Sequence, residues 1–148
     1  MILYRQDNFL TKKHCDYLID FFKKSNSYAY NHNKIIGNIN SFIFQHKDLD
    51  VLNKVSKLFN EYDLSNPDNM EIVKWPTNSN MIPHYDTGDR FAFIIYLNDN
   101  FKGGETIIDN VLITPKIGRL VLFSNGVYEH QVKKIIDGTR YTLIAWYK

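Results

Sequence analysis

The sequence has few residues that could cross-link the chain or interrupt its secondary structure, and it has no apolar run long enough to cross a membrane. It contains one cysteine (Cys15) and four prolines, and its longest uninterrupted apolar run is Phe91–Leu97. A lone cysteine excludes an intrachain disulfide, which fits a reducing compartment. The apolar run is too short to span a bilayer, and the first residues lack an apolar targeting segment. We therefore expect a soluble, cytoplasmic protein that does not bind membranes.

The sequence also lacks an excess of charge of one sign. Its formal net charge is +2, and the lysines lie in scattered pairs rather than in a basic run. This pattern favours solvated faces and gives no electrostatic basis for a nucleic-acid partner. Aromatic residues are abundant at 15%, which favours a β-rich core with a pocket. A length of 148 residues predicts one domain, residues 1–148, that can bury a core of its own.

The first seventy residues read as a helical N-terminal support, residues 1–70. Thr11 is a candidate N-cap for a helix from Lys12 to about Lys24, whose apolar residues recur at helical spacing. A second amphipathic helix is expected from Asp48 to about Tyr62. The Asn- and Ser-rich segment 25–40 is expected to be a loop that includes an edge strand or acts as a flap, and 41–44 reads as a strand.

From Glu71 onward, short apolar or alternating runs are separated by turn residues. They predict strands near 71–75, 81–86, 90–97, 105–108, 111–114, 119–123, 127–135 and 139–147. Short strands at this spacing favour a double-stranded β-helix, or jelly roll, at residues 71–148. The fold class is therefore mainly β with flanking helices (α+β), and the two N-terminal helices are expected to pack on one sheet.

The segment His84-Tyr85-Asp86 is the first candidate functional motif. In an extended strand, residues i and i+2 point to the same face, so His84 and Asp86 can reach one ion together. His130, on a distant strand, would add a second imidazole and complete a facial two-histidine, one-carboxylate set. Such a set leaves coordination positions open, as non-heme Fe(II) oxygenases require, although zinc accepts the same ligands.

Several landmarks around these residues occur in a family-specific order. They are Phe91–Asn98, Gly103-Gly104-Glu105-Thr106, Gly118–Phe123, His130 and Arg140–Trp146. In this order the chain resembles the 2-oxoglutarate/Fe(II)-dependent dioxygenases, specifically their prolyl 4-hydroxylase-like branch, from about Glu71 to Lys148. The resemblance implies an enzyme with Fe(II) as its metal, 2-oxoglutarate and O2 as cosubstrates, and ascorbate as a candidate additional reductant.

The resemblance also implies roles for residues outside the metal set. Arg140 matches the basic residue that binds the distal carboxylate of 2-oxoglutarate, and a guanidinium suits that task because it offers a planar fork of donors. Tyr96 matches a tyrosine on the same carboxylate, with core packing as the alternative. Trp146 matches a tryptophan beside the iron pocket, with core packing as the alternative. Arg90 lies near the mouth of the barrel as a candidate substrate contact, with a solvent-exposed strand arginine as the alternative, and Trp75 is a third candidate substrate residue. Trp75 lies at about the position where the branch commonly has a tyrosine, so the resemblance does not determine the cosubstrate or substrate contacts at that position.

The substrate is the least determined part of this interpretation. The first hypothesis is hydroxylation of a prolyl residue in a peptide or protein, with succinate and CO2 as co-products. The first alternative is a free amino acid or another small metabolite as substrate. A second is a jelly-roll binding module without activity, which retention of the three ligands and Arg140 argues against. A nucleic-acid demethylase fits less well, because the second arginine of that branch is replaced here by Trp146.

Overall fold

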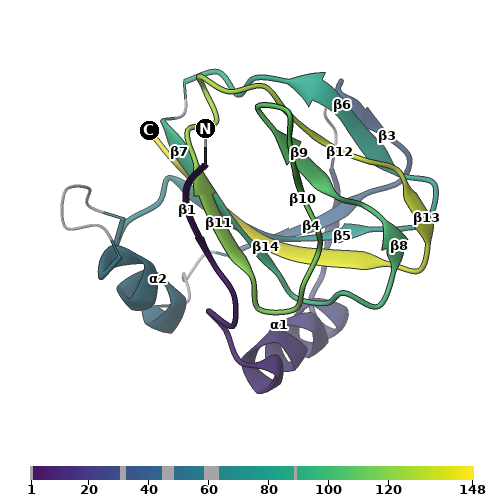
Figure 1. Ribbon diagram of the computed structural model, residues 1–148. Helices are drawn as coiled ribbons and strands as arrows, with labels where there is room; N and C mark the ends of the chain where they lie inside the picture. Colours follow the sequence, from purple (N-terminus) through teal and green to yellow (C-terminus); the bar gives the residue numbers. More distant parts are fainter. Residues whose placement is uncertain (1, 31–32, 45–48, 59–63, 89) are drawn as a thin grey trace.

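The computed structural model describes residues 2–30, 33–44, 49–58, 64–88 and 90–148. Within these ranges the chain forms two α-helices and fourteen strands, and all the strand pairs are antiparallel. Figure 1 shows two layers of strands facing each other, with both helices outside the layers. No helix among the described residues is long and apolar enough to cross a membrane.

The larger sheet has seven strands and supplies most of the core. In spatial order its strands are β1 (Ile2–Gln6), β11 (Leu120–Phe123), β7 (Phe91–Tyr96), β14 (Arg140–Tyr147), β5 (Asn69–Trp75), β4 (Asn40–Ile43) and β2 (Tyr28–Ala29). The central strands β7 and β14 are buried almost throughout. Both faces of this sheet are therefore covered.

The smaller sheet has five strands and faces the inner side of the larger one. Its strands are β10 (Val111–Ile113), β9 (Thr106–Ile108), β12 (His130–Val132), β6 (Asn80–His84) and β3 (Ile35–Ile36), and a separate pair joins β13 (Ile135–Asp137) to β8 (Lys102–Gly103). One buried cluster combines Ile94 and Tyr96 of β7 with Ile108 of β9. The sheets thus form a jelly roll with an interior between them.

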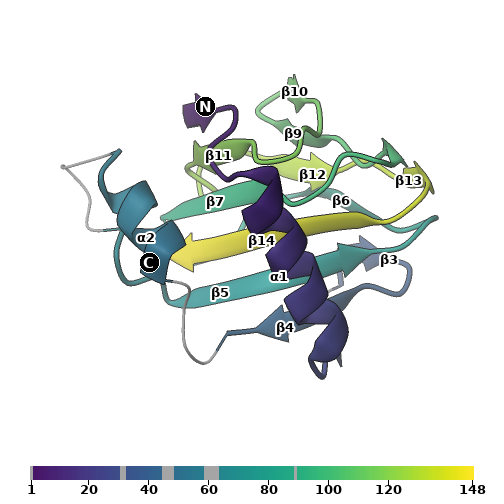
Figure 2. The ribbon, with the colours of Figure 1, turned by 90° about the horizontal axis from the view of Figure 1, so that it is seen from below.

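The outer face of the larger sheet shares a second core with the helices α1 (Lys12–Lys24) and α2 (Leu49–Ser56). The Thr11 hydroxyl caps α1 by accepting a hydrogen bond from the His14 amide at 3.1 Å, as the sequence predicts. Leu18 and Phe22 of α1 belong to the same buried cluster as Leu143 of β14. Figure 2 shows α1 lying across β14 and β5.

The segment between β2 and β3 links the edges of the two sheets. Its first end, at Tyr28–Ala29, pairs with β4 of the larger sheet, and its second end, at Ile35–Ile36, pairs with β6 of the smaller sheet. Tyr30 donates its amide hydrogen to the carbonyl of Ile39 at 2.8 Å. Within the described residues, the expected loop over 25–40 therefore contains short edge strands at Tyr28–Ala29 and Ile35–Ile36.

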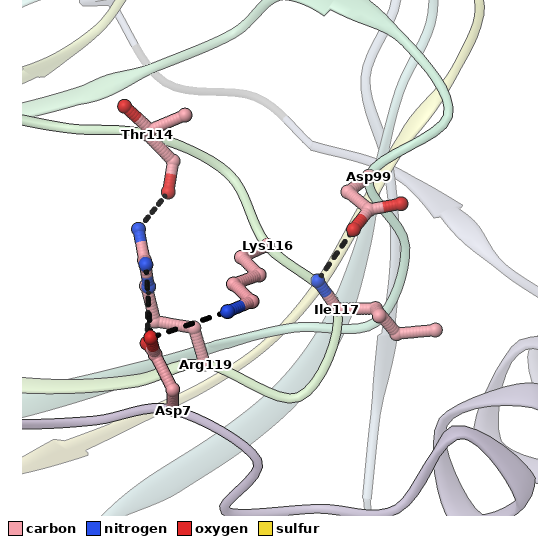
Figure 3. A network of polar contacts seen from close by, with 6 residues as sticks. All are labelled: Asp7, Asp99, Thr114, Lys116, Ile117 and Arg119. Carbon is pink, nitrogen blue, oxygen red and sulfur yellow. Dashed lines mark hydrogen bonds and ion pairs between the residues drawn. The ribbon is translucent and has the colours of Figure 1, made fainter.

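A polar network ties the end of β1 to the turn before β11 (Figure 3). The Arg119 guanidinium donates from Nε to Asp7 Oδ1 at 2.6 Å and from Nη1 to the Thr114 carbonyl at 2.6 Å. Lys116 Nζ lies 3.4 Å from Asp7 Oδ2. Arg119 is itself buried, so these bonds give its charge the partners that burial requires.

Three sequence predictions need correction. The strand expected over 81–86 ends at His84, so Asp86 lies just beyond β6. The strand expected over 127–135 is divided, because the chain leaves the smaller sheet after Val132 and β13 pairs with β8 instead. This turn lets Ile135 enter a cluster with Trp75, where it is fully buried. The second helix is shorter than expected and spans Leu49–Ser56, while its expected ends at Asp48 and Tyr62 lie outside the described residues.

Candidate metal and cosubstrate site

A cavity of about 400 Å³ lies between the two sheets. Strand β14 forms one wall, since alternate side chains from Arg140 through Thr142 and Ile144 to Trp146 line it. His84 and His130 line the same cavity from the smaller sheet, and Asp86 lines it from just beyond the end of β6. The sequence motifs predicted to work together therefore line one cavity.

The three candidate ligands converge at the paired ends of β6 and β12. His84 and His130 are register partners, and their ring centroids lie 4.3 Å apart. His84 Nε2 lies 3.3 Å from Asp86 Oδ1, and His130 Nε2 lies 3.3 Å from Asp86 Oδ2. Neighbouring ligands of one metal ion, each about 2.1 Å from it, would be about 3 Å apart. The spacing therefore fits a single ion.

Both imidazoles are oriented by main-chain carbonyls. His84 Nδ1 lies 2.8 Å from the Ile82 carbonyl oxygen, and His130 Nδ1 lies 3.0 Å from that of Tyr128. A carbonyl only accepts, so each Nδ1 carries a proton and each Nε2 faces Asp86. Each Nε2 meets the carboxylate either as an imidazolium N–H or, in the neutral ring, through a cation that both nitrogens and the carboxylate bind. The donor set therefore fits a divalent metal.

The electrostatics of the three groups agree with that requirement. Burial raises the pKa of the Asp86 carboxyl, but hydrogen bonds from His130 and His84 outweigh it, so this pKa is held far below its ordinary value. Burial lowers the pKa of His84, and the Asp86 carboxylate outweighs that effect and raises it overall. The site thus holds a carboxylate anion and favours positive charge beside it.

Arg140 lies deep in the cavity wall and is only 1% exposed. Its Nε donates to the Gly104 carbonyl and its Nη2 to Thr106 Oγ1, both at 3.0 Å, and its guanidinium lies over the rings of Trp75 and Tyr96. Burial lowers its pKa, an effect that Tyr96 opposes. No carboxylate pairs with it among the described residues. A buried cation of this kind can bind an anionic ligand.

Thr106 and Tyr96 complete the polar end of the cavity. The Tyr96 hydroxyl is hydrogen bonded to Thr106 Oγ1 at 2.6 Å, and the same Thr106 oxygen accepts from Arg140. Thr106 lines the cavity, whereas Tyr96 is fully buried behind it. Gly103 and Gly104 precede this group with φ of +76° and +69°, and a Cβ on Gly103 would come within 2.1 Å of the Lys134 carbonyl oxygen. These backbone conformations favour glycine at both positions.

Comparison with known proteins identifies the family. The family model of the 2OG-Fe(II) oxygenase superfamily matches residues 70–148, more than half of the chain. The chain belongs to this superfamily. Its members are dioxygenases that use Fe(II), 2-oxoglutarate and O2. The two histidines, the aspartate and the buried arginine lie within the matched residues.

Two human prolyl 3-hydroxylases are similar in sequence to part of this chain. Human prolyl 3-hydroxylase 2 is 34% identical over 73 residues, and human prolyl 3-hydroxylase 3 is 37% identical over 73. These matches cover 44% of this chain and 10% of each relative, so the chain spans about a tenth of their length.

Two solved structures share the fold. A Pseudomonas putida prolyl-4-hydroxylase aligns over 98% of this chain and 91% of its own, with a TM-score of 0.73 and 16% identity. A Trichoplax adhaerens prolyl hydroxylase, in complex with a hypoxia inducible factor oxygen degradation domain peptide fragment, covers 97% and 82%, with a TM-score of 0.74 and 19% identity.

The expected substrate residues of this oxygenase have different locations. Trp75 and Trp146 both line the cavity, Trp75 as a nearly buried ring against Arg140 and Trp146 as a half-buried ring at the far end of β14. Arg90 is exposed, its guanidinium lies over the Phe91 ring, and it is not among the residues that line the cavity. The structure therefore does not bring Arg90 to the site.

Sequence reasoning missed two residues of this site. Thr106 was named only as the last residue of the Gly103–Thr106 landmark, without a role in the site. Asn125 was not singled out, yet its Nδ2 donates to Asp86 Oδ2 at 2.9 Å. Asn-Gly dipeptides are common turn signals, so nothing in the sequence distinguished Asn125 from an ordinary turn residue.

Proposed function

We propose that this oxygenase hydroxylates a prolyl residue in a peptide or protein. His84, Asp86 and His130 would hold Fe(II), and Arg140, Thr106 and Tyr96 would hold the distal carboxylate of 2-oxoglutarate. One observation carries the assignment: a cavity joins a convergent two-histidine, one-carboxylate set to a buried arginine that has no carboxylate partner among the described residues. A dicarboxylic keto acid fits between two such groups.

When bound, Fe(II) with 2-oxoglutarate and O2 supplies the oxidising power that inserts one oxygen atom into a C–H bond and releases succinate and CO2. The chain's own residues would position the reactants. The carbonyls of Ile82 and Tyr128 keep Nε2 of each histidine unprotonated and aimed at the ion. The Arg140 guanidinium would bind the cosubstrate carboxylate where little water competes, which strengthens the ion pair. The apolar wall formed by Ile94, Phe123 and Ile144 would exclude water.

The prolyl substrate is supported by the relatives and by the far end of the cavity. The curated relatives are named prolyl 3-hydroxylases, and the two solved structures are prolyl hydroxylases. Trp146, at the opposite end of β14 from Arg140, lines the cavity together with Tyr85 and Tyr30, and they offer ring faces to a substrate side chain. The assay described below would identify which carbon of the proline ring is hydroxylated.

We also propose that residues 1–70 support a catalytic core at 71–148 within one domain. In this arrangement α1 and α2 brace the outer face of the larger sheet, as their shared buried cluster suggests. The cytoplasmic location expected from the single cysteine stays a prediction. So does the use of ascorbate.

A succinate-release assay tests the proposal. Proline-containing peptides, free proline and other free amino acids are each incubated with the enzyme, Fe(II) and 2-oxoglutarate, and mass spectrometry locates the added oxygen. We expect oxygen on peptidyl proline. Turnover of free amino acids without turnover of peptides would replace the peptide substrate with a small metabolite. An anaerobic titration with Fe(II) and 2-oxoglutarate should give a weak visible charge-transfer band, which an inactive binding module would not produce.

The Asp86→Ala variant tests the metal assignment. Removing the only anionic ligand should abolish both the visible band and hydroxylation. Asp20→Ala, which removes an exposed carboxylate from α1, is the matched control and should leave both unchanged. Full hydroxylation by Asp86→Ala would show that the metal is held elsewhere.

A further inference from the structure

Asn125 makes two hydrogen bonds to the same candidate ligand. Its Nδ2 donates to Asp86 Oδ2 at 2.9 Å, and its main-chain carbonyl accepts from the Asp86 amide at 3.1 Å. Asn125 lies in the turn between β11 and β12, far in sequence from Asp86, and it is fully buried. The carboxylate and the backbone of Asp86 are thus both held by one residue of another loop.

The same turn also orients the second histidine. The Tyr128 amide donates to the Ser124 carbonyl at 3.1 Å, which closes the turn, and the Tyr128 carbonyl lies 3.0 Å from His130 Nδ1. The turn Ser124–Tyr128 therefore contacts two of the three candidate ligands, although it supplies none of them. Any tilt of this turn would move Asp86 and His130 together.

We propose that Asn125 is a positioning residue for the metal ligand Asp86, an inference that rests on the proposed metal site. Its amide donates to Oδ2, and Oδ1 and Oδ2 face the Nε2 atoms of His84 and His130 at 3.3 Å each, so this hydrogen bond fixes the rotation of the carboxylate between the two histidines. The donor is neutral, which leaves the negative charge of Asp86 to the metal. A lysine or arginine at this position would compete with the ion for that charge.

A second observation argues against a purely structural role. Asn125 Oδ1 is buried and has no hydrogen-bond partner among the described residues. A buried amide oxygen left in this way costs stability, so the residue is a poor choice for holding the turn alone. The amide cannot be reversed either, because Oδ1 would then face the Asp86 carboxylate. The cost is accounted for if the amide is needed to position the ligand.

Metal binding by the full chain tests this role without requiring turnover. Co(II), which reports ligand geometry through its visible absorption bands, is titrated into the wild type, Asn125→Ala and Asn125→Ser. Ser124→Ala is the matched control, because it removes a side-chain hydrogen bond from the same turn, to the Arg90 carbonyl, without touching Asp86. Asn125→Ser covers the case in which Asn125→Ala does not fold.

We expect Asn125→Ala to weaken Co(II) binding about 10- to 100-fold, the range usual for partners of metal ligands, and to change the absorption bands. Ser124→Ala should bind Co(II) as the wild type does, and thermal melts without metal should be similar for both variants. Wild-type affinity and bands in a folded Asn125 variant would overturn the inference and leave the proposed function intact. Failure of the wild type to bind Co(II) or Fe(II) would overturn both.

Discussion

At the scale of single residues, this protein buries two ionisable side chains that have no ion-pair partner among its described residues. They are Arg140 on β14 and Glu71 on β5. Such groups lower stability unless a ligand or a proton compensates them. They are therefore the positions where substitution should affect binding and stability in opposite ways.

Arg140→Ala should raise the dissociation constant for 2-oxoglutarate well over tenfold. Leaving a buried carboxylate without its cation costs about 2–5 kcal/mol. Calorimetric titration of the metal-loaded protein with 2-oxoglutarate measures the effect, and metal affinity in the absence of cosubstrate should be almost unchanged. The control Arg140→Lys keeps the charge but loses the fork of donors, so an intermediate loss is expected. An unchanged affinity in Arg140→Ala would assign the arginine to a structural role.

Glu71→Gln should stabilise the protein at neutral pH. Burial raises the pKa of the Glu71 carboxyl, and hydrogen bonds with Asn69 and Ser41 oppose this only in part. Folding is therefore favoured by the protonated form, and that contribution is lost as the pH rises through the raised pKa. Thermal melts should show a higher Tm for Glu71→Gln at pH 8 and a much smaller difference at pH 4. A lower Tm for the variant at pH 8 would contradict this account.

At the scale of secondary-structure elements, the jelly roll depends on how its outer strand and its turns are attached. Among the described strands, β1 is an edge strand that pairs only with β11. The Asp7–Arg119 ion pair joins the residue that follows β1 to the residue that precedes β11. Edge strands have hydrogen-bonding partners on one side alone, so side-chain bonds of this kind keep them in register. The turn that carries Thr114 and Lys116 is held by the same network.

Asp7→Asn should lower the melting temperature at neutral pH and have little effect near pH 2. The hydrogen bond from Arg119 is the main reason that the pKa of Asp7 is lowered to about 2. A carboxylate with a lowered folded pKa stabilises the fold above its ordinary pKa, and the contribution disappears as the pH falls from about 4 toward 2. Thermal melts of both proteins between pH 2 and 7 measure this. Asp16→Asn, which breaks an exposed pair with Lys12 on α1, should have little effect at any pH.

At the scale of the whole molecule, the cavity is shared by both sheets and flanked by the segment that links them. Tyr30 lies in that segment and lines the cavity, while β2 and β3 attach it to the larger and the smaller sheet. A long peptide that reaches the candidate metal ligands would therefore pass close to residues of both edges. The described residues on either side of positions 31–32 are the ones to monitor.

A proline-containing substrate peptide should slow amide hydrogen exchange in residues 25–30 and 33–40. Contact with the peptide would stabilise the hydrogen bond from the Tyr30 amide to the Ile39 carbonyl and the short pairings of β2 and β3. Exchange within α1, on the opposite face of the larger sheet, serves as the internal control and should be unchanged. Protection confined to the His84–Asp86 region would show that the peptide does not use this segment.

The sequence by itself determined the elements whose pattern is local. The Thr11 cap and the apolar spacing after it fix α1, and the spacing of His84 and Asp86 marked both as candidate ligands of one ion, which the structure brings together with His130. Alternating and apolar runs predicted most strands from β5 to β14, because side-chain periodicity follows directly from backbone geometry. The order of landmarks from Phe91 to Trp146 predicted the family, which the match over residues 70–148 confirms.

Only the tertiary structure decided which distant side chains meet. The pairing of His130 with His84, the bond from Asn125 to Asp86 and the convergence of Thr106 with Arg140 all join segments that are far apart in the sequence. The same holds for the division of β12 from β13 and for the location of Arg90 outside the cavity. Strand register and the choice of pairing partner are set by the burial of whole sheet faces, a property that no local segment carries alone.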